Sequence, residues 1–403
     1  MSQKSQTVVL ANPPQNSTLK RQYQHIDNAH RYSYFDMNLY GTVGPKSFQN
    51  TVIVGVGGGA ESFDNRRWGF GGTLLSSASV TFLNPVVGVT PWAPDGTSPQ
   101  DTKNYITAFG AYISDLIKFG DRWHLTLGSR RDQQNAHGID AINPTKTPYA
   151  HALVSATVSQ VGAIYDFTKV VSGYVAWSQS FVPATITNAD ANGNYGFPPQ
   201  KGEQWEGGIK LETPDHKLFL SMATYYITRT NVAVATNTVT ANNIPIFRLD
   251  GAQHSEGAEL EMEWQPLPNW QFQGGVAVGK AFVASSIKNP TTVGLYLANA
   301  PTKTATLWNR YNIPHGPLKG LGFGLGIINV GSEWNGDPTT ASYFPIAGWT
   351  RFDGDMYYQW HRYKFSLDVR NVFDRQYIQL AQNALQMYPG DPRKLTITVS
   401  THF

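Results

Sequence analysis

The chain has 403 residues and a formal net charge of +3, and only 15% of its residues are charged. This charge is too small and too scattered to indicate a protein that binds nucleic acid. A mean hydropathy of −0.32 is too low for a bundle of membrane helices. In contrast, 38 glycines, 20 tyrosines, 20 phenylalanines and 11 tryptophans suit a protein built from many strands. Cysteine is absent, so no disulfide framework is expected.

The first residues, MSQKSQTVVLANPPQ, lack the apolar core and small-residue cleavage site of a secretory signal. We therefore expect residues 1–16 to be a disordered or irregular segment, and export of the chain as written to be doubtful. From residue 17 to residue 403 the pattern is continuous, which predicts one unit rather than several domains.

Apolar and polar residues alternate in segment after segment of this unit. The alternation predicts strands with one apolar and one polar face. In residues 363–370, for example, Tyr363, Phe365, Leu367 and Val369 alternate with Lys364, Ser366, Asp368 and Arg370. The predicted strands, about 16 in all, are 17–26, 31–43, 48–62, 103–119, 122–133, 151–167, 170–183, 202–213, 217–233, 245–265, 270–285, 299–313, 320–333, 346–360, 363–378 and 393–403.

The connections between these strands alternate in length. Short connections fall at 44–47, 120–121, 168–169, 214–216, 266–269, 314–319 and 361–362, and longer ones lie between them, up to the forty residues from 63 to 102. Short turns at one rim and long loops at the other are typical of outer-membrane barrels, whose long loops are extracellular.

The chain ends with a strand-like segment from Leu395 that closes on Phe403. A final amphipathic strand with a terminal aromatic suits the closing strand of an outer-membrane barrel and its recognition by the barrel assembly machinery. The predicted fold is therefore all-β, a transmembrane antiparallel β-barrel. A soluble antiparallel sandwich with one wet face, such as a carbohydrate-binding protein or a hydrolase, is the alternative.

Seven segments resemble, in order, segments of the TonB-dependent siderophore receptors. They are LGSRRDQQN from Leu127, GYVAWSQSFVP from Gly173, KGEQWEGGIKL from Lys201, YYITRTNV from Tyr225, HSEGAELEMEW from His254, NAPTKTATLWNRY from Asn299 and RNVFDRQY from Arg370, followed by the terminal strand. Residues 17–126 are compatible but less distinctive. By this resemblance Glu206, Glu259 and Glu261 are lumen charges, and Asn371 and Asp374 shape the exit of the penultimate strand into its loop.

The resemblance implies outer-membrane uptake of a ferric siderophore, with iron(III) entering only as the siderophore complex and no resident cofactor. Barrels of this family have about 22 strands and a plugged lumen, and the plug carries the motif that engages the TonB complex. Nothing before Tyr23 resembles a plug or that motif. We therefore expect the C-terminal part of a receptor, roughly six strands short of a full barrel. A passive sixteen-stranded porin-like channel is the alternative function.

No catalytic or metal-binding motif stands out, so we expect no enzyme and no metal site. Flat aromatic side chains in the long loops suit a bulky ligand with apolar and polar surface. The candidate ligand-binding residues, chosen by loop position, are Trp68, Phe70, Trp92, Tyr149, Tyr195, Phe197, Trp334, Tyr343 and Tyr388.

Overall fold

The computed structural model describes residues 2–9, 18–68, 75–81, 100–141, 150–183, 189–192, 197–239, 245–287, 289–336, 343–383 and 386–401. Within these ranges the chain is antiparallel β-structure with one short 3-10 helix, η1 (Pro290–Thr292). No helix in these ranges is long and apolar enough to cross a membrane.

Most strands belong to one 17-stranded sheet. Its members are β1 (Ser2–Val9), β2 (Thr18–Val43), β3 (Phe48–Trp68), β4 (Leu75–Thr81), β5 (Gln100–Phe119), β6 (Trp123–Asp140), β7 (Ala150–Asp166), β8 (Val171–Val182), β9 (Gln200–Glu212), β10 (Leu218–Thr230), β13 (Ala252–Leu267), β14 (Trp270–Ser285), β15 (Lys303–Asn312), β16 (Leu321–Val330), β19 (Trp349–Trp360), β20 (Tyr363–Arg370) and β23 (Lys394–Thr401).

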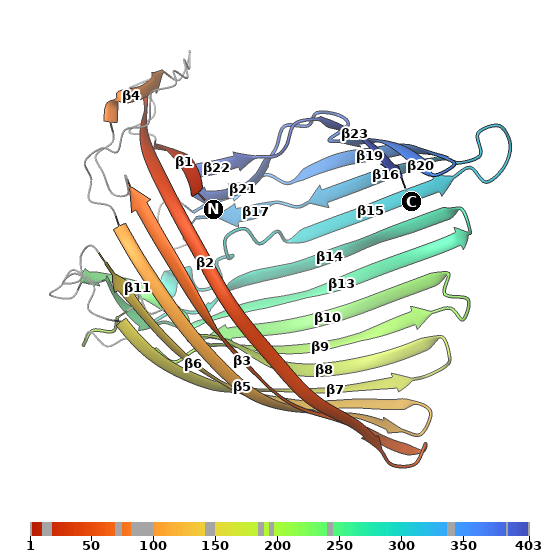
Figure 1. Ribbon diagram of the computed structural model, residues 1–403, viewed down its shortest axis with the longest axis horizontal. Coiled ribbons are helices and arrows are strands. Elements are labelled where there is room, and N and C mark those ends of the chain that lie inside the picture. The colour runs from red at the N-terminus through yellow and green to blue at the C-terminus, as the bar shows by residue number, and fades with distance from the viewer. Residues whose placement is uncertain are drawn as a thin grey trace.

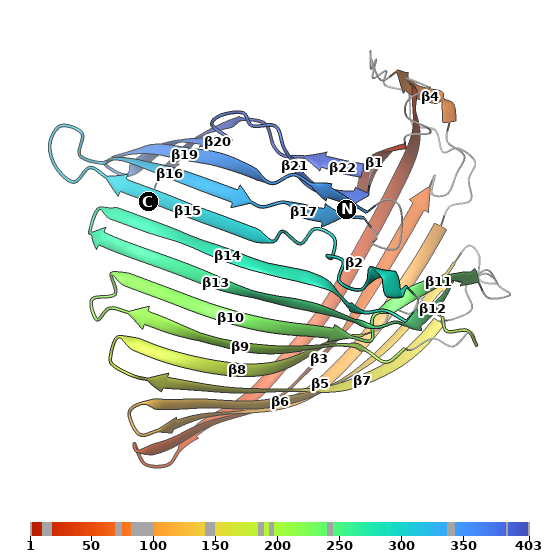
Figure 2. The ribbon, with the colours of Figure 1, turned by 180° about the vertical axis from the view of Figure 1, so that it is seen from behind.

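The long strands pair in sequence order, from β2 to β23, as a continuous antiparallel meander. Figures 1 and 2 show the resulting curved wall from two sides, with the short turns at one end and the longer connections at the other. Three further hairpins lie at the long-loop end: β11 (Ala233–Val239) with β12 (Pro245–Leu249), β17 (Glu333–Asn335) with β18 (Phe344–Ile346), and β21 (Ile378–Asn383) with β22 (Gln386–Pro389).

The two ends of the meander do not pair with each other within the described ranges. There β2 pairs with β1, β3 and β4, and β23 pairs with β20. The described strands therefore form an open curved wall, which differs from a sheet closed on itself at porin size.

Several predicted boundaries were wrong, each for a local reason. Strand β2 runs unbroken where two strands, 17–26 and 31–43, were expected, because residues 25–43 all pair in register with β3. An ion pair of 3.1 Å between Arg31 and Asp64 joins these strands just past the expected break. The predicted strand 245–265 is instead divided into β12 and β13 at Gly251. This glycine has a φ of +69°, and a Cβ there would overlap the carbonyl oxygen of Ser285.

The ends of other elements also differ from the sequence-based prediction. The 63–102 connection is shorter than expected, since β3 continues to Trp68, β5 begins at Gln100 and β4 lies between them. The expected irregular segment 1–16 contains β1, which pairs with β2. The division of the chain into a terminal segment and a barrel remains a prediction.

The sheet has one apolar and one polar face. Large apolar side chains cover the first face and remain exposed: Leu39 is 82% exposed and Ile397 79%. A soluble monomer rarely exposes so continuous an apolar surface, whereas lipid requires it. The opposite face carries ion pairs such as Arg130–Asp132 at 2.7 Å. A soluble sandwich would bury the apolar face against a second sheet, and the described residues form no such layer.

Candidate functional site

Three long-loop connections meet at the outer end of the wall and are tied together by Asn299 and Asn335. The Asn335 side chain is 1% exposed. Its Nδ2 donates to Asn299 Oδ1 at 3.0 Å and also to the carbonyl oxygen of Ala381. The Asn299 amide donates to the carbonyl oxygen of Trp334 at 2.7 Å. The loop before β15, the β17–β18 hairpin and the β21–β22 hairpin are thereby connected.

An aromatic pair lies on this junction. The rings of Trp334 and Tyr343 stack with their centroids 4.6 Å apart and their planes at 11°. The Tyr343 hydroxyl donates to the carbonyl oxygen of Tyr296 at 3.1 Å, which fixes the ring against the loop before β15. Both rings are half-buried, so a flat surface of fixed orientation remains accessible at the long-loop rim.

A second aromatic pair braces the same region from β19. Trp349 stacks on Tyr377 with centroids 4.2 Å apart, and Arg351 Nη1 donates to the Tyr377 hydroxyl at 3.2 Å. Arg351 also forms an ion pair of 2.9 Å with Asp353. This arrangement holds the start of the β21–β22 hairpin against the barrel wall.

Asn371 and Asp374 shape the exit from β20, as the resemblance implied. Asn371 is 1% exposed and has a φ of +52°, a left-handed conformation that asparagine tolerates better than most residues. Its Nδ2 donates to the carbonyl oxygens of Arg375 and Asp391, both at 2.9 Å, and its Oδ1 accepts from the Arg375 amide at 2.8 Å. Asp374 has a φ of +51° and accepts from the Arg393 amide at 2.7 Å.

Burial changes the titration of two groups in the β17–β18 region. Burial raises the pKa of the Glu333 carboxyl, so its neutral form is favoured relative to an exposed glutamate. Burial also raises the pKa of the Tyr343 hydroxyl, which keeps it a neutral hydrogen-bond donor. This part of the long-loop end therefore combines two stacked aromatic rings with a buried carboxyl group and a tyrosine hydroxyl that donates a hydrogen bond.

The structure brings two of the nine predicted ligand residues together, Trp334 and Tyr343. Phe197 lies half-buried just before β9, and Tyr388 is 48% exposed on β22, paired with Leu380. Trp68 is the last residue of β3 and pairs with His25. The residues Phe70, Trp92, Tyr149, Tyr195 and the terminal Phe403 lie outside the described residues. A ligand role for any of the nine remains a prediction.

Sequence reasoning missed Tyr296, Trp349 and Tyr377. Tyr296 lies within the predicted connection 286–298, so its loop position was a signal that could have found it. Trp349 was missed because it falls inside the predicted strand 346–360. Tyr377 fell inside the predicted strand 363–378, whereas β20 ends at Arg370. The positive φ of Asn371 ends that strand early. An Asn followed by Asp three residues later was the available signal for this turn.

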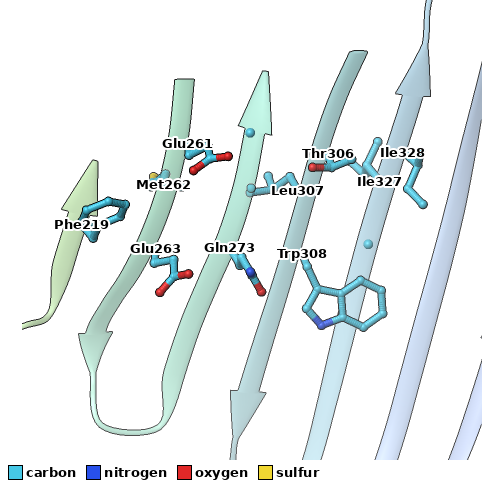
Figure 3. Close-up of a pocket in the computed structure, with 13 residues that line it drawn as sticks. Phe219, Glu261, Met262, Glu263, Gln273, Thr306, Leu307, Trp308, Ile327 and Ile328 are labelled. Carbon is cyan, nitrogen blue, oxygen red and sulfur yellow. The ribbon is translucent and has the colours of Figure 1, made fainter. Parts of the chain in front are cut away.

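The polar face carries a separate depression of about 440 Å3 on β13, β14, β15 and β16 (Figure 3). Gly274, Gly275 and Gly326 are among the residues that line it. Figure 3 shows Glu261 and Glu263 projecting from β13 and Trp308 lying toward β16. The strand register places Glu261 opposite Ser221 and Gly275, on the polar face. The same alternation puts Glu206 and Glu259 on this face, as predicted.

No group of three or more His, Cys, Asp or Glu residues in the described part of the chain is arranged to hold a metal ion. The described residues thus offer two candidate binding regions. The first is the aromatic rim, formed by Trp334 and Tyr343 at the long-loop end. The second is the depression on the polar face that is lined by Glu261, Glu263 and Trp308.

The sequence matches the family model described as TonB dependent receptor-like, beta-barrel, over residues 6–372. The chain belongs to this family. The chain, called the receptor barrel below, is thus neither a porin nor a soluble sandwich. These were the two alternatives that the sequence alone had left open.

Curated relatives of the receptor barrel include siderophore receptors. The chain is 27% identical over 377 residues to the ferrioxamine B receptor of Salmonella typhimurium, and the match covers 91% of this chain and 50% of that protein. It is 24% identical over 401 residues to a metal-pseudopaline receptor of Pseudomonas aeruginosa, covering 96% and 53%. The receptor barrel thus spans about half the length of the curated relatives it matches.

Solved structures share the fold. The ferripyoverdine receptor of the outer membrane of Pseudomonas aeruginosa superposes with a TM-score of 0.81 at 20% identity, covering 98% of this chain and 51% of that one. The ferric-catecholate import receptor of K12 E. coli gives a TM-score of 0.83 at 20% identity, covering 99% and 60%.

Proposed function

We propose that the receptor barrel is part of an outer-membrane receptor that takes up a ferric siderophore, with iron(III) carried only inside the siderophore complex. The observation that carries the proposal is the family match over residues 6–372, together with relatives whose names specify ferrioxamine B and ferrichrome. The exposed apolar face supports residence in a lipid bilayer.

The rim formed by Trp334 and Tyr343 is the proposed point of ligand contact. A ferric siderophore is bulky and presents both apolar and polar surface, and two stacked rings offer a rigid flat surface at low entropic cost. Tyr343 is held by its hydrogen bond to Tyr296, so the surface is formed before the ligand arrives. Such preorganisation favours affinity because less motion is lost on binding.

The proposed partners follow from the same assignment. They are the ferric siderophore, the TonB complex acting through a plug, outer-membrane lipid and the barrel assembly machinery; no nucleic-acid partner is proposed. The receptor class implies transport or binding without covalent chemistry, so we propose no enzymatic activity and no resident cofactor.

Fluorescence titration of the folded, detergent-solubilised protein tests the proposal. Ferric complexes of ferrioxamine B, a catecholate siderophore and a pyoverdine are added separately, with the iron-free siderophores as controls. We expect saturable quenching of tryptophan emission by at least one ferric complex. Trp334→Ala should weaken that binding about tenfold, the loss of roughly 1–2 kcal/mol of aromatic contact.

Trp360→Phe is the matched control, because Trp360 ends β19 at the short-turn rim, far along the strand from the aromatic pair. Its binding should equal that of the wild type. Absence of saturable quenching with every ferric complex would contradict the proposal.

A further inference from the structure

The apolar face carries a depression of about 590 Å3 near the long-loop ends of β15, β16 and β19. Two glycines border it, Gly331 and Gly348, which lie at the two ends of the connection from β16 to β19. A Cβ on Gly348 would lie 2.7 Å from the carbonyl oxygen of Val330, and a Cβ on Gly331 would lie 2.6 Å from Cγ of Lys303. The backbones therefore approach closely and leave an open recess beside them.

The lower wall of this recess is aromatic. Phe352 lies on the apolar face of β19, and Phe373 packs edge-on against it with ring centroids 5.2 Å apart and planes at 84°. Phe373 is 72% exposed. Two rings in this arrangement present a hydrocarbon-compatible surface that water would solvate poorly.

The upper edge of the recess is polar and cationic. Asn329 Nδ2 donates to Thr350 Oγ1 at 2.8 Å, and Lys303 and Arg375 also line this recess. Both basic side chains are exposed. Neither forms an ion pair with another described residue, in contrast to Lys280, whose ammonium is 2.9 Å from Glu256.

Arg375 is held in place by the turn after β20. Its amide and its carbonyl oxygen both bond to the side chain of buried Asn371, at 2.8 and 2.9 Å. The backbone that carries this guanidinium is therefore fixed, and less conformational entropy is lost when the group binds an anion.

The recess lies at the height where an apolar membrane layer gives way to headgroups. Lys303 begins β15 and Asn312 ends it next to the short turn. At about 3.3 Å per residue and a tilt of about 40°, the strand rises roughly 20–25 Å between them. The apolar band of such barrels is about 25 Å tall, so Lys303 lies at its outer boundary.

We propose that this recess binds the phosphate-bearing headgroup of an outer-leaflet lipid. The phosphate lies between Lys303 and Arg375, because two unpaired cations complement a group that carries more than one negative charge. The hydrocarbon chains run along Phe352 and Phe373 toward the middle of the membrane. The site is distinct from the aromatic rim and requires only that the barrel resides in a lipid bilayer.

Lipid retention by the full chain, folded in detergent micelles and measured by native mass spectrometry, tests this inference. The probes are phosphatidic acid, phosphatidylcholine with the same acyl chains, and inorganic phosphate. We expect phosphatidic acid to be retained at least tenfold more strongly than phosphatidylcholine. The variant Lys303→Gln with Arg375→Gln should lose this preference, and Lys303→Arg with Arg375→Lys should keep most of it.

The matched control removes the same charge from the opposite face of the wall. Lys364 and Arg370 lie on the polar face of β20, and Lys364 Nζ is 4.3 Å from the centroid of the Tyr357 ring. The variant Lys364→Gln with Arg370→Gln should retain phosphatidic acid like the wild type. An equal loss in this variant would mean that net charge, rather than the recess, determines retention.

Three further results would overturn the inference. Wild-type retention of phosphatidic acid by the folded Lys303→Gln, Arg375→Gln variant would exclude these cations. Displacement of phosphatidic acid by equimolar inorganic phosphate would indicate a site for a free anion rather than a lipid. Equal retention of the two lipids by the wild type would indicate a nonspecific apolar surface, and this comparison decides the matter even if the glutamine variant does not fold.

Discussion

Replacing Asn371 with alanine tests how the outer loops are held to the barrel. The asparagine side chain makes three hydrogen bonds to the backbone, two with Arg375 in the turn after β20 and one with the carbonyl oxygen of Asp391 before β23, and its φ is +52°. Alanine would lose all three bonds and would also be forced into a left-handed conformation. Because the side chain is 1% exposed, water cannot readily replace the lost partners.

The expected cost follows from these contacts. Each lost hydrogen bond contributes about 1 kcal/mol, and a left-handed alanine costs about 1–2 kcal/mol. Asn371→Ala should therefore lower the free energy of unfolding by about 4 kcal/mol. Asn371→Gly loses the same bonds without the backbone strain, so its cost should be about 1 kcal/mol smaller.

Asn231 provides a matched comparison. It has a φ of +58°, and its side chain makes one described hydrogen bond, from Nδ2 to the carbonyl oxygen of Pro199 at 3.0 Å. Asn231→Ala should cost about 2 kcal/mol less than Asn371→Ala, the contribution of two hydrogen bonds. Urea unfolding of the folded protein, followed by tryptophan fluorescence, measures both. Equal costs for the two variants, or a cost below about 1 kcal/mol for Asn371→Ala, would refute the reasoning.

The remaining predictions concern the rim and the wall. Tyr343→Phe removes the hydroxyl that bonds to Tyr296, and we expect siderophore affinity to fall about two- to tenfold, the effect of one hydrogen bond, as measured by fluorescence titration; unchanged affinity would place the ligand elsewhere. Burial raises the pKa of Glu333 in the folded protein, so folding favours the neutral carboxyl group. Its contribution to the free energy of unfolding is therefore fully present below the ordinary pKa of glutamate, and it is lost as the pH rises through the pKa of the folded state. Glu333→Gln should therefore raise the melting temperature at pH 7 and have little effect at pH 4, and an equal shift at both pH values would argue against burial of the carboxylate as the cause. Gly326→Ala would place a Cβ against the Trp308 indole, so we expect a shift in tryptophan emission that is absent when Trp308→Phe is combined with it.

The fold was largely predictable because the two faces of a barrel strand require apolar and polar residues to alternate along the sequence. Strand β14 runs from Trp270 to Ser285, as predicted, since Trp270, Phe272, Val276 and Val278 recur at alternate positions and a Pro-Asn pair marks the preceding turn. The sequence-based boundaries failed where pairing with a neighbour overrode local composition. The polar residues Asp27, Asn28 and His30 indicated a connection between two strands. In the structure, residues 27–30 pair with β3, and β2 continues through them.

The candidate site was less predictable, because loop position alone says little about contact. Trp334 and Tyr343 were chosen as separate loop aromatics, and their stacking depends on a hairpin that periodicity did not reveal. Tyr296 contributes a backbone oxygen, which no side-chain pattern can predict. The recess on the apolar face depends on Gly331 and Gly348, which are far apart in the sequence and come together only when the two ends of the β16–β19 connection approach each other.

The junction around Asn299 and Asn335 bears on how specificity in this barrel could be altered. Three loops that belong to different hairpins share hydrogen bonds within a few ångströms, from Asn335 to Asn299 and from the Ala381 amide to the same Asn299 oxygen. A graft that exchanges one of these loops leaves buried amide groups in the other two without partners. Ligand preference should therefore transfer between related receptors only when all three loops are exchanged as a single piece.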